Sequence, residues 1–142
     1  MIALPPWIRR SVVAVHLSPS STRARGARRP STRAAGAALE RRAAWHYRLR
    51  GFRVLGQNVW TGGNELDLVL RRGRRLVFAE VKGKSAGDHG SPAEMVGPEK
   101  RRRVRRAAEA WLAAHPEAAE LEVSFDVVAV SGGRLRRIRD AF

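Results

Sequence analysis

Two runs of the sequence decide the fold: Glu65-Leu-Asp-Leu-Val-Leu70 and, after five intervening residues, Leu76-Val-Phe-Ala-Glu-Val-Lys82. Both are short and rich in Leu, Val and Phe, a composition that favours β-strands. The basic segment 71–75 between them has Gly73 at its centre, which predicts a hairpin turn. The two runs are therefore expected to pair as neighbouring antiparallel strands.

The charged residues of these strands lie two positions apart, and side chains at that spacing point to the same face of a strand. Glu65 thus shares a face with Asp67, and Glu80 shares a face with Lys82. Paired strands would bring three carboxylates and one ammonium group to one patch. Each residue alone also fits a structural role, as a solvent-facing acid or half of an ion pair. The four together fit that role less well, because charges in an apolar strand cost burial energy unless they are paired or used.

Helix and strand periodicity on both sides of this hairpin predicts an α/β fold. The predicted elements are a helix over 32–50, strands over 52–59, 65–70 and 76–82, a helix over 98–114, and strands over 123–130 and up to Ile138. Gly51 is expected to stop the first helix, and Ser91 to open a short helical turn after a loop over 83–91. The order α-β-β-β-α-β-β indicates a mixed sheet flanked by helices, in one domain over 32–142.

The charge balance predicts a polyanionic partner. Lys and Arg number 28 against 13 Asp and Glu, which gives a net charge of +15 and favours nucleic acid as the partner. No acid precedes Glu40, and residues 1–31 are expected to form a disordered basic arm, a reading favoured over a transit peptide. No apolar run approaches the roughly 20 residues of a membrane span, so no membrane partner is expected. The chain lacks cysteine, which fits a reducing compartment and a cytoplasmic location.

The carboxylates of the hairpin are candidate metal ligands. Asp67 and Glu80 offer the oxygen atoms that Mg²⁺ or Mn²⁺ prefers, and the backbone carbonyl of Val81 is a further candidate ligand. Such an ion polarises a phosphodiester and lowers the pKa of an attacking water. Lys82 would orient that water or stabilise the developing charge, and Glu65 would assist as a supporting or alternative ligand.

The helix over 98–114 is a candidate nucleic-acid surface. Its apolar stripe should face the sheet, so its basic residues should project outward to phosphate groups or, alternatively, simply into solvent. The candidates are Lys100, Arg101, Arg102 and Arg105. Lys100 could also lie near the carboxylates.

Other polar and aromatic residues are expected to be structural. Asp126, in the apolar run 123–130, is expected to pair with an arginine. Trp45, Trp60 and Trp111 are expected to pack in the core or at a sheet edge instead of stacking on bases.

At these residues the chain resembles a known family. Asp67 with Glu80-Val-Lys82 is similar to the motif of the PD-(D/E)xK nuclease superfamily, and the wider pattern resembles the bacterial YraN/UPF0102 family. The matching segments include Gly36–Glu40, Gly51-Phe52, Asn58, Glu65–Leu68, Val77–Lys82, Gly90–Glu94, Pro98 with Lys100, Phe125–Val130 and Ala141-Phe142. The resemblance covers residues 32–142 and implies a restriction-endonuclease-like fold, similar to that of archaeal Holliday-junction resolvases, with a nucleic-acid role. The departures at Asn64, Lys84 and Gly97 leave every acid and the motif lysine in place.

The same resemblance implies that Glu40 reaches the site from the first helix. It is the only acid in a long basic stretch, although a surface pair with Arg41 explains it equally well.

These features predict a Mg²⁺- or Mn²⁺-dependent endonuclease that hydrolyses phosphodiester bonds in DNA, with branched or damaged DNA as candidate substrates. A homodimer would suit cleavage of both strands of a junction. The main alternative is a non-catalytic nucleic-acid-binding protein that retains the nuclease fold, and a third is an RNA- or ribosome-associated structural protein. The intact Asp67, Glu80 and Lys82 favour the enzyme, because a pure binder does not need them.

Overall fold

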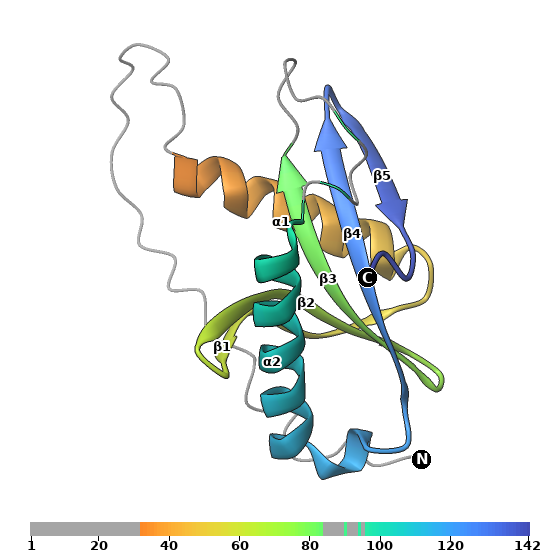
Figure 1. Cartoon of the computed structure of the whole chain (residues 1–142). Helices are drawn as coiled ribbons and strands as arrows, with labels where there is room; N and C mark the ends of the chain where they lie inside the picture. Colours follow the sequence, from red (N-terminus) through yellow and green to blue (C-terminus); the bar gives the residue numbers. More distant parts are fainter. Residues whose placement is uncertain (1–31, 84–89, 91–93, 95) are drawn as a thin grey trace, which may run out of the picture.

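Five β-strands form one mixed sheet, and a long helix packs against each of its faces (Figure 1). The computed structural model describes residues 32–83, 90, 94 and 96–142. The elements are α1 (Thr32–Arg48), β1 (Arg53–Thr61), β2 (Asn64–Arg72), β3 (Arg75–Gly83), α2 (Pro98–Ala114), the 3₁₀ turn η2 (Pro116–Ala118), β4 (Glu122–Ser131) and β5 (Arg134–Ile138). The predicted fold class and element order are confirmed. The predicted basic arm, and most of the predicted loop and helical turn between β3 and α2, lie outside the described residues.

The strands follow one another across the sheet in the order β1-β2-β3-β4-β5. All neighbours are antiparallel except β3 and β4, which are parallel. A parallel pair needs a long crossover connection, and α2 lies in the segment that connects β3 to β4. The predicted hairpin is confirmed and is tighter than expected, because Arg72 pairs with Arg75 and leaves only two residues in the turn.

Helix α1 ends in a Schellman motif. The amide of Gly51 donates to the Arg48 carbonyl at 3.0 Å, and the amide of Phe52 donates to the Tyr47 carbonyl at 3.1 Å. Gly51 has a φ of +82°, which glycine adopts without a Cβ penalty. The ring of Phe52 then meets that of Tyr47 edge-on, with centroids 5.2 Å apart. This stop confirms the role predicted for Gly51 and ties the end of α1 to the start of β1.

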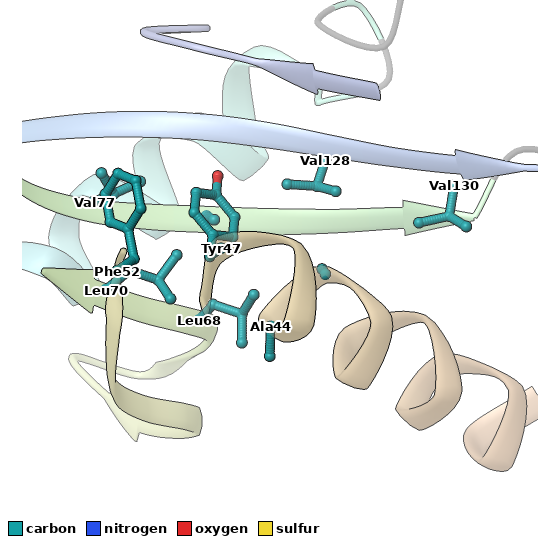
Figure 2. Packing of buried hydrophobic residues seen from close by; sticks show 10 residues of the cluster. Ala44, Tyr47, Phe52, Leu68, Leu70, Val77, Val128 and Val130 are labelled. Atoms are coloured by element: carbon teal, nitrogen blue, oxygen red, sulfur yellow. The ribbon is translucent and has the colours of Figure 1, made fainter. Parts of the chain in front are cut away.

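Alternation along β3 separates two hydrophobic cores. Val77 and Ala79 face α1, whereas Leu76 and Phe78 face α2. Figure 2 shows the first core, in which Tyr47 of α1 meets side chains of β2, β3 and β4. The second core contains the predicted apolar stripe of α2: Val104, Ala107, Ala108 and Trp111 are buried, and Leu112 packs against them partly buried. The two helices are therefore held at fixed positions on opposite faces of the sheet.

The tryptophan prediction is right for Trp111, which packs in the core, and wrong for Trp45, whereas Trp60 lies on the edge strand β1 and is exposed there. Trp111 is 4% exposed, whereas Trp45 is 60% and Trp60 is 72% exposed. In α1, Ala43 and Ala44 face the sheet, and the next residue turns toward solvent. In β1, Val59 packs in the α2 core, so alternation points Trp60 the other way.

No helix in the described part of the chain combines the length and the apolar character needed to cross a membrane.

Candidate active site

The sheet forks between β2 and β3, and the predicted carboxylates lie at the fork. Regular pairing of the two strands ends at Leu68 and Ala79. Beyond that pair, β2 continues beside β1, and β3 continues beside β4 (Figure 1). One further step in the same register places Asp67 opposite Glu80. The amide N–H of Val81 donates to Asp67 Oδ2 at 2.8 Å. Where the strands separate, this backbone N–H therefore binds a side-chain carboxylate.

Glu80 is almost completely buried and only partly paired. The residue is 1% exposed overall, and its Oε2 lies 3.3 Å from the Lys100 ammonium nitrogen. Within the described part of the chain, its Oε1 is buried without a hydrogen-bond partner. Burial raises the pKa of Glu80. The positive charges of Lys100 and Lys82 oppose this rise, and the negative charge of Glu65 adds to it. An unpaired buried carboxylate oxygen is costly, so it marks a place where a cation or donor would bind favourably.

Asp67 is half-buried beside this carboxylate. Burial raises its pKa to about 7, and the nearby Glu80 charge adds to the rise. The hydrogen bond from the Val81 amide and the charge of Lys100 lower the pKa of Asp67, whereas the charge of Glu40 raises it. The two carboxylates therefore repel each other in a partly desolvated place, and a bound cation would relieve that repulsion.

Glu40 approaches this patch from α1. Its charge acts on Asp67, and its Oε2 accepts a hydrogen bond from the Asn58 side-chain amide at 2.8 Å. The partner of Glu40 in the structure is therefore Asn58, and its part in the site stays a prediction. The side chain of Asn58 and the amide of Val81 were not foreseen as parts of the site. Two signals pointed to Asn58: an asparagine is unfavourable inside a strand, and Asn58 is one of the positions that match the family.

Lys82 and Glu65 lie at the margin of the patch. Lys82 is half-buried, two residues beyond Glu80 on the same strand, and its charge acts on Glu80. Glu65 is exposed, and its charge also acts on Glu80. All the acids predicted for the site therefore converge on one end of the β2–β3 pair.

The basic residues of α2 differ in their surroundings. Lys100 does not project outward, because it pairs with Glu80; its alternative placement near the carboxylates is the one observed. Arg101 donates to the Val96 carbonyl at 2.7 Å and covers the Phe142 ring at 5.6 Å. Arg105 covers the rings of Phe125 and Phe142. The exposed members are Arg102, Arg103, Arg105 and Arg106.

The patch suits a hydrated divalent ion better than a closed metal cage. Asp67 and Glu80 supply carboxylate oxygens, and one of these is buried and unpaired. No group of three or more His, Cys, Asp or Glu side chains able to enclose a metal occurs among residues 32–83, 90, 94 and 96–142. Mg²⁺ is commonly held by one or two carboxylates and keeps several waters, so the residues present fit it.

The mixed sheet, its two flanking helices and the carboxylate–lysine patch are consistent with the restriction-endonuclease-like class of α/β proteins. The model of a family described as "Uncharacterised protein family UPF0102" matches residues 39–130. A UPF0102 protein of Methylorubrum extorquens (strain PA1) is 41% identical over 118 residues, which are 82% of this chain and 91% of that protein. Another, of Acidiphilium cryptum (strain JF-5), is 43% identical over 123 residues, 87% of this chain and 93% of that protein. The chain belongs to the UPF0102 family, as the resemblance implied.

Proposed function

We propose that this protein is a metal-dependent endonuclease that hydrolyses phosphodiester bonds in DNA. The observation that carries the proposal is the buried Glu80, with one oxygen unpaired, beside the second carboxylate of Asp67. A structural protein gains nothing from two partly desolvated carboxylates that repel each other.

Asp67 and Glu80 would hold Mg²⁺ or Mn²⁺, with the Val81 carbonyl as a further candidate ligand. When bound, such an ion polarises the phosphate and lowers the pKa of a coordinated water. The Val81 amide holds one oxygen of Asp67, and Lys100 holds one oxygen of Glu80, which orients both carboxylates. Lys82 donates an N–H to the attacking water or to the developing negative charge.

Two further acids would support the metal ligands. Glu40 and Glu65 lie close enough for their charges to act on Asp67 and Glu80, respectively. Each can accept a hydrogen bond from a water at the ion, and each adds negative charge that favours a divalent cation.

The substrate would be held mainly through its backbone. The net charge of +15 and the exposed arginines of α2 attract phosphate groups independently of sequence. Branched or damaged DNA is the proposed substrate, in the cytoplasm, and a homodimer would place two sites on one junction. The same charges would serve a non-catalytic nucleic-acid-binding protein, so the support for an enzyme comes from the carboxylates.

The proposal is tested by cleavage of linear, nicked and branched DNA, and of RNA, with Mg²⁺ or Mn²⁺. The wild type is compared with Asp67→Asn and Lys82→Ala, and with Glu117→Gln as a control at an exposed acid away from the fork. We expect metal-dependent cleavage of DNA that both site variants lose and the control keeps. Binding without metal-dependent cleavage would support the non-catalytic alternative. Cleavage that survives both substitutions would come from a contaminating nuclease and would overturn the assignment of the site.

A further inference from the structure

Asn58 interrupts the regular structure of β1 at the level of the site. The residues on either side pair normally, Gln57 with Leu68 and Val59 with Leu66. The same register places Asn58 opposite Asp67, yet Asn58 has a φ of +50° instead of an extended conformation. It is one of two non-glycine residues with positive φ in the described part of the chain. A row of three residues, Asn58, Asp67 and Glu80, thus crosses β1, β2 and β3.

The backbone of Asn58 does not by itself require asparagine. Asparagine tolerates the left-handed region better than most residues, but glycine adopts it more readily. Asparagine supplies what glycine lacks, which is a side-chain amide. That amide donates to Glu40 Oε2 at 2.8 Å, across 18 residues of sequence and from a strand to a helix.

The hydrogen bond fixes an otherwise mobile type of side chain. Glu40 is half-buried on α1, and a glutamate there has several rotamers available. The Asn58 amide selects a rotamer that directs the carboxylate toward β1 at the position facing Asp67. Because the amide binds only Oε2 in this contact, the other oxygen of Glu40 remains available to an ion or its water.

We propose that Asn58 is a positioning residue of the metal site. Its side-chain amide holds the Glu40 carboxylate near Asp67, so that Glu40 accepts a hydrogen bond from a water of the divalent ion. The inference rests on the proposed metal site and adds to it a side chain from β1 and a defined role for Glu40.

The test is a Mn²⁺ titration of the full chain by calorimetry, with melting temperature as the second readout. The variants are Asn58→Gly, Glu40→Gln and the double variant, with Gln57→Ala as the matched control because it removes the neighbouring exposed amide. Asn58→Gly keeps the left-handed backbone and removes only the amide. We expect it to weaken Mn²⁺ binding about tenfold, the low end of what loss of a ligand-orienting partner costs, without lowering the melting temperature.

The double variant separates positioning from a purely structural role. If Asn58 acts through Glu40, the double variant should bind Mn²⁺ no more weakly than Glu40→Gln alone. Wild-type affinity in Asn58→Gly, or additive losses in the double variant, would overturn the inference. Asp67→Asn, measured in parallel, distinguishes a failure of the Asn58 inference from a failure of the proposed metal site. If it loses Mn²⁺ binding while Asn58→Gly does not, only the inference fails; if the wild type binds no Mn²⁺, both fail.

Discussion

Glu80 and Asp126 are buried carboxylates on neighbouring strands of one sheet, and their surroundings differ. Asp126 is fully buried, and both of its oxygens are paired. Its Oδ2 accepts hydrogen bonds from the Tyr47 hydroxyl at 2.7 Å and from Arg137 Nε at 2.6 Å. Its Oδ1 accepts a longer one, of 3.3 Å, from the Asp140 amide. The prediction that Asp126 pairs with an arginine is confirmed.

Glu80 has the opposite arrangement. One oxygen meets the partly exposed Lys100, and the other has no partner in the described residues. The nearby Asp67 is a second carboxyl group, whose pKa the Glu80 charge helps to raise. Burial of a carboxylate therefore does not by itself indicate function. The distinguishing feature is whether the native structure completes its hydrogen bonds and neutralises its charge.

The largest expected effect is the loss of DNA cleavage caused by the substitution Glu80→Gln. Loss of the metal ligand should lower kcat about a thousandfold, because a Lewis acid supplies several kcal/mol of charge stabilisation. The free energy of unfolding without metal should change by less than about 1 kcal/mol, since Lys100 stays solvated and the desolvated charge is removed. Single-turnover kinetics and urea denaturation measure the two quantities. A large loss of stability with cleavage intact would make Glu80 structural and remove the contrast with Asp126.

Asp126→Asn should have the opposite effect to Glu80→Gln, with the main loss in stability and not in cleavage. It leaves Arg137 buried without its counter-ion and should destabilise the fold by about 3–5 kcal/mol. The control is Glu122→Gln on the same strand, whose ion pair with Arg74 is exposed and should be worth less than about 1 kcal/mol. Urea denaturation compares the two variants. Equal, small losses would show that Asp126 is not the structural counterpart of Glu80.

The pH dependence of stability should report the open carboxylate patch. The pKa of Asp67 rises from its ordinary value of 3.8 to about 7 in the folded protein, so folding favours its protonated form. Without metal, the wild type should lose stability relative to Asp67→Asn as pH rises from about 4 to about 7, by at most about 4 kcal/mol. Urea denaturation across this range measures the difference. A difference that does not vary with pH would contradict the shift.

Divalent metal should reverse that loss. At pH 8 Asp67 is deprotonated, so Mg²⁺ at 100 times its Kd should stabilise the wild type by about 2.7 kcal/mol. Asp67→Asn should gain little, because one ligand and one charge are missing. Thermal denaturation with and without Mg²⁺ provides the measurement. Equal stabilisation of both proteins would place the ion elsewhere.

The smallest effect is expected on the outward face of α2, away from both carboxylates. Arg102→Ala should weaken DNA binding a few-fold and lower the salt slope of log Kd by about one, without changing stability. Arg101→Ala serves as the comparison, because Arg101 also holds the Val96 carbonyl and covers Phe142, so its loss should lower stability as well. Fluorescence anisotropy at several salt concentrations tests this. An unchanged salt slope would make Arg102 a solvated residue only.

Local patterns made much of the fold predictable. The short apolar runs and central glycine of the β2–β3 hairpin, and the apolar stripe of α2, depend on residues close in sequence. The acids were likewise predictable as a group, because charges stand out in apolar strands. Side-chain partners across elements were less predictable: Lys100 turned toward Glu80, and Trp60 turned away from the core. Those outcomes depend on how a helix sits over a sheet and on which strand lies at the edge.

The sequence alone determined the element order, the β2–β3 hairpin and the set of candidate metal ligands, because these follow from spacing and chemical type. Only the tertiary structure decided which carboxylate is satisfied. Asp126 finds Tyr47 and Arg137 because α1 and β5 pack beside β4. Glu80 keeps an unpaired oxygen because β2 and β3 separate at its position, and a strand fork results from the pairing of distant segments.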